Sequence, residues 1–368
     1  MRRKLFTLLT VSVMTIAILT GCAKENSENS EAASVASSEE EKELTPADMK
    51  VGVCIHKFSD TYMSLFKNEL EKDLIESGFN KDNIKIVNSA VSHGYEMLQI
   101  RKLIEEGVDI LIVNPVNTSM AGEVTDLAIE AGIPLIYVNR EPLAAEELRW
   151  EKNNWKVTYI GCDARHAGII QGKIITDLGM DVVDKNGDGV VQYIMIEGER
   201  NNTDAFFRTK FSVSTLEKAG WRVACLADSY GNWDKNIAEY AVNKALEEHP
   251  NAEVIFCNND SMALGALVAV DNAGLIPGED LYIVGADAFE SALEEILNGK
   301  IAGTVFNDYV QQARLTTGAV LSYMKKQNVE HYYGCDYVKV TKENAESILD
   351  IIRDDSEDEE ENVESSAN

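Results

Sequence analysis

Residues 51–78, VGVCIHKFSDTYMSLFKNELEKDLIESG, contain a strand pattern followed directly by a helix pattern. The run Val51–Ile55 is short and apolar, as expected of a strand that is buried on both faces. Phe66, Leu70 and Leu74 recur every four residues, which places them on one face of a helix. Gly78 then supplies a typical end to that helix. This stretch therefore predicts one β-strand–α-helix unit.

The same alternation continues along most of the chain. Helical patterns such as Met97, Ile100 and Ile104 separate apolar, strand-like runs. Further strands are predicted at 84–87, 109–113, 133–138, 157–160, 191–196, 221–226, 253–257, 282–284 and 304–306. Repeated units of this kind form parallel sheets with helices on both faces. About a dozen strands are too many for one domain of ~150 residues, so the sequence predicts two similar α/β lobes.

The N-terminal segment predicts export. Three basic residues, Arg2, Arg3 and Lys4, precede an uncharged run of residues 5–20 that is shorter than the ~20 residues of a membrane-spanning helix. The run ends in LTGC at 19–22, which resembles a bacterial lipoprotein signal. That resemblance implies a signal peptide over 1–21 and an acylated Cys22 that anchors the protein to the cell membrane. A plain secretory signal or an uncleaved anchor is the alternative.

Both ends of the remaining chain are polar and acidic. Residues 22–46 are rich in Ser and Glu, which predicts a flexible stalk, and residues 354–368 predict a solvated acidic tail. The whole chain has 34 basic and 62 acidic residues, a net charge of −28. This charge repels nucleic acid, so a nucleic-acid partner is not expected.

Five cysteines follow Cys22, an odd number without short paired spacings. Cys54 and Cys257 lie inside apolar strand-like runs. The cysteines are therefore expected to be buried free thiols rather than a disulfide framework.

Several predicted strands end in an Asn or Asp. Ligands of open α/β sheets bind beyond the carboxyl ends of strands, although the same residue types also cap helices and form turns. Carboxylates and amides exchange hydrogen bonds with neutral hydroxyl groups, which makes a sugar the expected ligand. Tyr62 and Trp233 stand beside polar residues and can pack on a sugar ring. The strand-end residues are Asn114, Asn139, Asp163, Asn258, Asn259, Asp260, Asp287, Asn307 and Asp308.

Sequence signatures of catalysis are missing. The chain has no HExxH, GxSxG, GxxxxGK[ST] or CxxC motif, and its five histidines are scattered. A non-enzymatic binding protein is therefore predicted. A hydrolase or isomerase that uses carboxylates such as Asp60 and Asp287 remains the alternative.

Several stretches together resemble the periplasmic galactose/glucose-binding proteins, the sugar-binding subunits of ABC importers. The resemblance begins in VGVCIHKFSDTYMS at 51–64 and extends from Met49 to about Val340. It is also carried by NREP at 139–142, GIIQG at 168–172, NNDSMALGA at 258–266 and AGTVFND at 302–308. It implies an α/β fold of the periplasmic binding protein type I: two Rossmann-like lobes with parallel sheets, joined by a three-crossover hinge.

The resemblance also implies which side chains bind the ligand. Tyr62 and Trp233 would stack on opposite faces of the sugar ring, Arg208 would donate, and the Asp carboxylates would accept from hydroxyls. Two positions depart from the family pattern: Asn202 replaces a His expected at the CH₂OH end of the sugar, and His56 replaces a Tyr. The implied ligand-binding residues are Asp60, Tyr62, Asn114, Asn202, Asp204, Arg208, Trp233, Asn259, Asp287 and Asn307.

A calcium loop is predicted at residues 184–192. Asp184, Asn186, Asp188 and Gln192 occupy positions 1, 3, 5 and 9 of an EF-hand-like pattern, with Gly189 at position 6. The backbone carbonyl of Val190 would serve at position 7. The usual Glu at position 12 is missing, and the resemblance implies that Glu253 closes the site. The expected role of Ca²⁺ is structural.

The predicted lobes divide the chain as follows. Residues 47–133 and 308–338 form the N-terminal lobe, and residues 134–307 and 339–353 form the C-terminal lobe. The crossovers are expected near 133–135, 306–308 and 338–341.

The predicted function is that of a monomeric, extracytoplasmic, lipid-anchored solute-binding protein. It would capture D-galactose or D-glucose by hinge closure and deliver the sugar to ABC permease subunits. The alternatives are a sugar-sensing subunit of a membrane receptor or chemoreceptor, or a binding protein for another hexose or a pentose.

Overall fold

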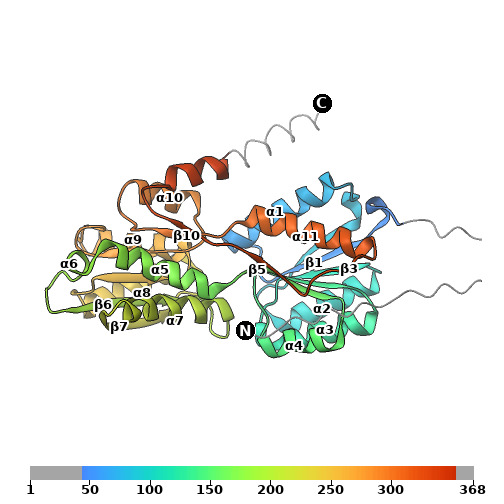
Figure 1. Ribbon diagram of the computed structural model, residues 1–368, viewed down its shortest axis with the longest axis horizontal. Coiled ribbons are helices and arrows are strands. Elements are labelled where there is room, and N and C mark those ends of the chain that lie inside the picture. Colours follow the sequence, from blue (N-terminus) through green and yellow to red (C-terminus); the bar gives the residue numbers. More distant parts are fainter. Residues whose placement is uncertain (1–43, 354–368) are drawn as a thin grey trace, which may run out of the picture. The chain divides into compact units, whose positions relative to one another are not determined.

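The computed structural model describes residues 44–353 (Figure 1). The predicted signal peptide, Cys22, most of the predicted stalk and the acidic tail lie outside the described residues. Within residues 44–353, no helix has both the length and the apolar character needed to cross a bilayer.

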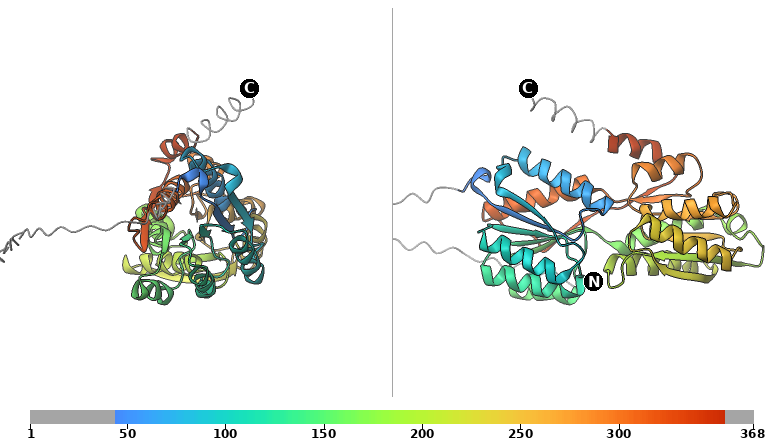
Figure 2. Two further views of the ribbon diagram at one scale, coloured as in Figure 1. Left: turned by 90° about the vertical axis from the view of Figure 1, so that its right-hand side faces the viewer. Right: turned by 180° about the vertical axis from the view of Figure 1, so that it is seen from behind.

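The first lobe contains a parallel sheet of six strands in the order β11-β5-β4-β3-β1-β2. Helices α1 and α11 cover one face, and α2, α3 and α4 cover the other (Figures 1 and 2). The strands are β1 (Val51–Ile55), β2 (Ile84–Asn88), β3 (Ile110–Val113), β4 (Leu135–Val138), β5 (Val157–Cys162) and β11 (Tyr332–Cys335). The helices are η1 (Pro46–Asp48), α1 (Thr61–Glu76), η2 (Lys81–Asn83), α2 (His93–Glu105), η3 (Thr118–Met120), α3 (Ala121–Ala131), α4 (Ala144–Asn153) and α11 (Tyr309–Met324).

The second lobe has a parallel four-stranded sheet in the order β7-β6-β8-β9. Strand β10 runs beside β9 through isolated bridges and pairs antiparallel with β12. The strands are β6 (Val190–Glu197), β7 (Arg222–Tyr230), β8 (Val254–Cys257), β9 (Tyr282–Val284), β10 (Thr304–Phe306) and β12 (Val338–Val340). The helices are α5 (Ala164–Leu178), α6 (Met180–Val183), α7 (Thr203–Lys218), α8 (Lys235–Glu248), α9 (Asp260–Asn272) and α10 (Glu290–Leu297).

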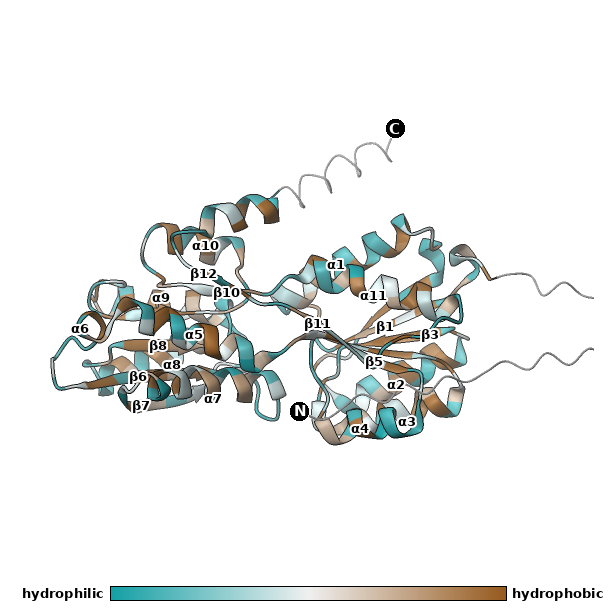
Figure 3. Cartoon of the chain, in the orientation of Figure 1, coloured by the Kyte–Doolittle hydropathy of each residue, from teal (hydrophilic) through white to brown (hydrophobic). Residues whose placement is uncertain are grey.

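Alternation along the strands explains why helices cover both faces of each sheet. In β1, Val51, Val53 and Ile55 pack in the core beneath α1 and α11, whereas Cys54 packs in the core on the opposite face. All five residues of β1 are buried, so the strand reads as a continuous apolar run. Figure 3 shows the same concentration of hydrophobic residues on the central strands. The prediction of two α/β lobes with parallel sheets is confirmed.

The predicted lobe boundary is wrong in one place. Strand β4 pairs with β3 and β5, so residues 134–162 belong to the first lobe and not to the second. The first crossover therefore follows Cys162, where β5 leads into α5, and not residues 133–135. The uninterrupted strand–helix alternation gives no local sign of which sheet a strand joins.

The other two crossovers lie close to their predicted positions. The chain passes from β10 in the second lobe to α11 in the first at Phe306–Tyr309. The last crossover lies between Cys335 and Val338, slightly before the predicted 338–341, because Val338 already pairs with Phe306 in the second lobe. Strands β11 and β12 were not predicted, since each is short and partly exposed.

Candidate ligand-binding site

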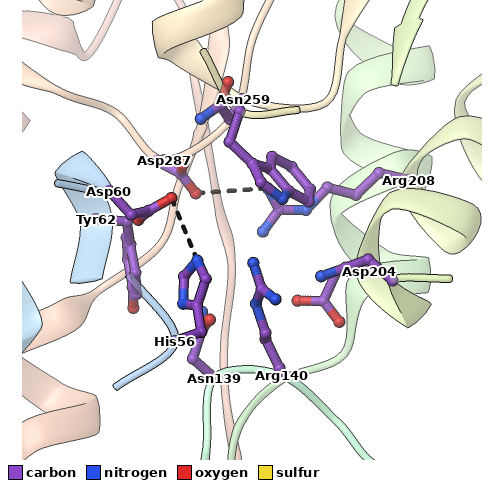
Figure 4. Close-up of a pocket in the computed structure, with 11 residues that line it drawn as sticks. His56, Asp60, Tyr62, Asn139, Arg140, Asp204, Arg208, Asn259 and Asp287 are labelled. Atoms are coloured by element: carbon purple, nitrogen blue, oxygen red, sulfur yellow. Dashed lines mark ion pairs between the residues drawn. The ribbon is translucent and has the colours of Figure 1, made fainter. Parts of the chain in front are cut away.

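A cavity of about 360 Å³ lies between the two lobes, at the carboxyl ends of the strands. His56 directly follows β1 and Asn139 follows β4, while Asn259 and Asp287 lie just beyond β8 and β9. The labelled side chains converge on one space from both lobes (Figure 4). The lining residues are His56, Asp60, Tyr62, Asn139 and Arg140 from the first lobe, and Asn202, Asp204, Arg208, Trp233, Asn259 and Asp287 from the second.

Three of these residues begin helices. The side chains of Asp60, Asn202 and Asn259 accept hydrogen bonds from backbone N–H groups in the first turns of α1, α7 and α9, at 2.9, 3.0 and 3.0 Å. Each side chain is therefore both a helix cap and part of the cavity wall. The cap holds the side chain in one rotamer, so the polar groups are oriented before any ligand arrives.

Arg208 is the central cation of the second-lobe wall. Its Nη1 donates to the carbonyl of Asn258 at 2.7 Å and lies 3.5 Å from Oδ1 of Asp287, while Nη2 donates to the Tyr337 hydroxyl at 3.1 Å. The guanidinium is fully buried, and its Nε has no protein partner. These contacts fix the plane of the guanidinium group.

Burial dominates the titration of the cavity acids. It raises the pKa of Asp287 to about 7 and that of Asp204 to about 6, although Arg208 acts in the opposite direction on both. Burial likewise raises the pKa of Asp60. Each carboxylate is therefore costly to keep ionised in the free protein, and hydrogen bonds from a ligand would offset part of that cost.

His56 presents an acceptor to the cavity. Asn114 donates to the carbonyl of Val138 at 3.0 Å and to Oδ1 of Asn139 at 3.2 Å, which leaves its own Oδ1 facing Nδ1 of His56. Burial and the charge of Arg140 lower the pKa of His56 well below its usual value, so the ring is neutral. With the proton on Nδ1, Nε2 carries a lone pair; it has no hydrogen-bond partner in the protein and lies 4.0 Å from Oδ2 of Asp60 (Figure 4).

The two aromatic side chains are held in fixed orientations. The Tyr62 hydroxyl donates to Oδ1 of Asn307 at 3.2 Å. Trp233 has a left-handed backbone, with φ of 62°, and its ring packs on Gly198 so closely that a Cβ there would overlap it. A glycine is therefore required at position 198 for the ring to reach the cavity.

Four buried polar atoms of the cavity residues have no hydrogen-bond partner in the protein. His56 Nε2 and Asp204 Oδ1 are acceptors, while Arg208 Nε and Trp233 Nε1 are donors. Buried polar groups are nearly always satisfied, so this mixture indicates a ligand whose groups both donate and accept. Hydroxyl groups have this property, which phosphate or carboxylate groups lack.

The structure brings most of the predicted ligand-binding residues together. Asn114 and Asn307 do not line the cavity: Asn114 supports His56, and Asn307 links Tyr62 to Asp287 through a 3.2 Å hydrogen bond from its Nδ2. The predicted residues that line the cavity are Asp60, Tyr62, Asn202, Asp204, Arg208, Trp233, Asn259 and Asp287.

The ligand-binding set implied by the resemblance lacks three lining residues, His56, Asn139 and Arg140, although Asn139 was among the predicted strand-end residues. Their position directly after β1 and β4 was the available signal. Arg140 also lies between His56 and Asp204 in Figure 4 and forms an ion pair with Glu199 at 2.9 Å.

The predicted calcium loop folds against Glu253. Glu253 Oε1 accepts from the Lys185 N–H at 2.7 Å and Oε2 from the Gln192 N–H at 2.9 Å, while Asp184 accepts from the N–H groups of Gly187 and Gly189, both at 2.7 Å. Within residues 44–353, no three acidic, His or Cys side chains are placed to hold one metal ion. The side chains of Asn186 and Gln192 instead bond to each other at 3.1 Å. The oxygen-rich donor chemistry suits Ca²⁺, and an amide can turn its oxygen inward.

Comparisons with known proteins agree with this architecture. Residues 51–328 match the periplasmic binding protein domain. The chain is 33% identical over 274 residues to the D-galactose/methyl-galactoside binding periplasmic protein MglB of Haemophilus influenzae, covering 73% of this chain and 79% of that protein. It is 23% identical to the ribose import binding protein RbsB of Escherichia coli, over 80% of this chain and 90% of that protein. An ABC transporter solute-binding protein from Bacillus halodurans with bound myo-inositol has a TM-score of 0.72 at 21% identity, covering 83% of this chain and 98% of its own.

The two-lobed α/β fold with a cavity at the strand ends is that of a binding protein. The chain belongs to the periplasmic binding protein family.

Proposed function

We propose that this protein is the sugar-binding component of an ABC importer and that it captures D-galactose or D-glucose. The observation that carries the proposal is that the cavity, which Tyr62 and Trp233 help to line, contains buried donors and acceptors without a partner in the protein. The Haemophilus relative, whose name states galactose binding, supports a hexose.

The sugar would be recognised through two kinds of protein group: charged groups that accept hydrogen bonds from its hydroxyls, and donors that are held in fixed positions. Asp60, Asp204 and Asp287 accept from sugar hydroxyls, and Nε2 of His56 offers a further acceptor. Arg208 and the Trp233 indole donate in return. Tyr62 and Trp233 exclude water from the two faces of the ring, so each hydrogen bond forms in a dry site where an unpaired polar group is costly.

Capture would proceed by closure of the lobes. The ligand contacts residues of both lobes, so it stabilises the state in which the two walls of the cavity face each other. The three crossovers are the segments that would bend, and the permease would read the closed form. No step of this function breaks a covalent bond, and the protein acts as a binding protein rather than an enzyme.

Two other functions use the same site. A sensor subunit would hand the sugar-bound form to a receptor, and a binding protein for another sugar would differ only in which hydroxyls it meets. The similarity to the ribose-binding protein of E. coli makes a pentose the main competitor.

Titration calorimetry against D-galactose, D-glucose, D-fucose, D-allose, D-ribose and myo-inositol tests the proposal. The family resemblance implies that Asp60 meets the hydroxyl at C4, and a carboxylate can accept from either orientation of it, so we expect the two hexoses that differ only at C4 to bind most tightly. Recovery of unchanged sugar is the control against catalysis. Tighter binding of ribose would refute the galactose/glucose assignment, and failure of every sugar would refute the function itself.

We also propose that the protein is extracytoplasmic and attached to the membrane through an acylated Cys22. The signal-like segment and the family's periplasmic members support this location. Labelled palmitate is expected to be incorporated into the unaltered protein and not into a Cys22→Ala variant, and absence of label from the unaltered protein would contradict the anchor.

We further propose that Ca²⁺ binds residues 184–192 and Glu253 and acts structurally. The acidic loop supports this, since Asp184, Asp188 and Glu253 lie around one turn. Calcium is expected to raise the melting temperature, because binding to the folded state alone stabilises by ~2.7 kcal/mol at a hundredfold excess over Kd. Melting curves with chelator and with added calcium make the comparison.

Sugar affinity is expected to change little on calcium removal, because none of the predicted ligands lines the cavity. Asp188→Asn should abolish the calcium-dependent shift, and Asp280→Asn, on another surface loop, should keep it. Coincident curves for the unaltered protein would mean that the loop is a turn without metal.

A further inference from the structure

A second cavity of about 920 Å³ adjoins the candidate sugar site. Most of its wall comes from the second lobe, including Glu197, Phe206 and Tyr230, and Thr118 contributes from the first lobe. We call the 360 Å³ cavity the inner cavity and this one the outer cavity. Neither the predicted sugar contacts nor the calcium loop accounts for the outer cavity.

The two cavities are adjacent. Asn202 lines both of them. Beside it, Arg140 of the inner wall forms a 2.9 Å ion pair with Glu199 of the outer wall, and both are largely buried. Asn202 and the Arg140–Glu199 pair therefore form part of a wall that the two cavities share.

The outer cavity combines exposed rings with hydrogen-bonding groups. Phe206 is 57% exposed and Tyr230 is 39% exposed, which is unusual for large apolar side chains at the edge of a buried site. The Arg200 guanidinium lies 4.9 Å from the centre of the Tyr230 ring and holds that ring in place. The hydroxyls of Thr118 and Thr203, 2.8 Å apart, lie on the same wall.

These features match the ones that favour a sugar in the inner cavity. Flat rings offer surfaces for C–H groups, and hydroxyl, amide and carboxylate groups offer partners for sugar hydroxyls. Arg200 is engaged by Tyr230, and the acidic Glu197 and Glu199 disfavour an anionic ligand. A neutral polyhydroxylated or aryl group fits this wall better than a phosphate.

We propose that the outer cavity is a second subsite, which holds the second unit of a disaccharide or glycoside whose first ring occupies the inner cavity. This inference rests on the proposed sugar-binding function and extends its ligand class from monosaccharides to two-unit sugars. The substituent passes Asn202 and packs against Phe206 and Tyr230.

Calorimetry with matched ligands tests the subsite. The probes are D-galactose, D-glucose, both anomers of methyl and phenyl D-galactopyranoside, lactose and melibiose, which direct the second unit from different positions of the first ring. At least one phenyl galactoside or disaccharide is expected to bind as tightly as its parent monosaccharide or more so. The double variant Phe206→Ala/Tyr230→Ala should weaken that ligand roughly tenfold and leave the monosaccharide within about twofold.

Tyr240→Ala is the matched control, because Tyr240 is 73% exposed on α8 and lines neither cavity. The subsite is disproved if monosaccharides bind but every two-unit ligand is excluded. It is also disproved if the double variant weakens both ligand classes equally. Failure of all the sugars would overturn the proposed function and the subsite with it, so the two failures are distinguishable.

Discussion

Replacing Arg208 with lysine is expected to weaken the binding of galactose and glucose by about ten- to a hundredfold. Arg208 presents a guanidinium plane fixed by Asn258 and Tyr337, with Nε free for the ligand. Lysine keeps the positive charge next to Asp287, but its single ammonium group cannot replace the planar, fixed set of N–H donors of the guanidinium. A lost hydrogen bond to a charged group is worth roughly 1.5–3 kcal/mol, which corresponds to this range in Kd.

The lysine variant is preferable to alanine because it leaves Asp204 and Asp287 with a buried counter-charge. Loss of affinity can then be separated from unfolding by a melting curve on the same sample. Arg149→Lys is the control, since Arg149 pairs with Asp126 and Glu146 outside the cavity. An Arg208→Lys protein with unchanged affinity for both hexoses would show that Arg208 does not contact the ligand.

Replacing Asp287 with asparagine is expected to have opposite effects on binding and on stability. Binding should weaken by roughly ten- to a hundredfold, because a charged acceptor is lost from a buried site. The sugar-free protein, in contrast, should melt several degrees higher than the unaltered protein at pH 8. The reason is that burial raises the pKa of Asp287 to about 7 from the usual 3.8.

The sign of this pH dependence follows from where the proton is held. Between the unfolded pKa of 3.8 and the folded pKa of about 7, the folded protein keeps a proton that the unfolded chain has lost. The stability contributed by this group is thus complete below pH 3.8 and declines as the pH rises through about 7. The melting temperatures of the two proteins should therefore converge near pH 4 and separate at pH 8.

Asp271→Asn is the matched control, because the Asp271 side chain is 51% exposed on α9. Its melting temperature should follow that of the unaltered protein at both pH values. If Asp287→Asn melts lower than the unaltered protein at pH 8, the ion pair with Arg208 outweighs the burial cost, and the carboxylate is ionised in the free protein.

Local patterns were sufficient to predict much of the candidate site. Asn139, Asn259 and Asp287 closely follow apolar runs, and in a parallel sheet the ends of such runs meet at one edge, whereas Asp60 was predicted from the family resemblance. The competing interpretation of these residues as helix caps was also right, since Asp60 and Asn259 do cap α1 and α9. Asn259 serves both purposes because β8 ends and α9 begins within three residues of each other.

The sequence by itself determined the α/β class and ten of the strands, because each depends on residues close together in the chain. Hydrophobic periodicity and the residue types that end strands are local properties. Tertiary structure alone decided which lobe each strand joins. Strand β5, for example, lies in the first lobe because Tyr159 and Cys162 pair with Tyr332 and Cys335, more than a hundred residues away.

Tertiary structure likewise decided the charge states of the cavity acids and the presence of the outer cavity. The raised pKa of Asp287 arises from burial by both lobes, and the pairing of Arg140 with Glu199 joins segments that no periodicity relates. Desolvation and long-range pairing depend on what surrounds a side chain in space. A sequence pattern shows only a residue and its neighbours along the chain, so neither desolvation nor long-range pairing can be predicted from it.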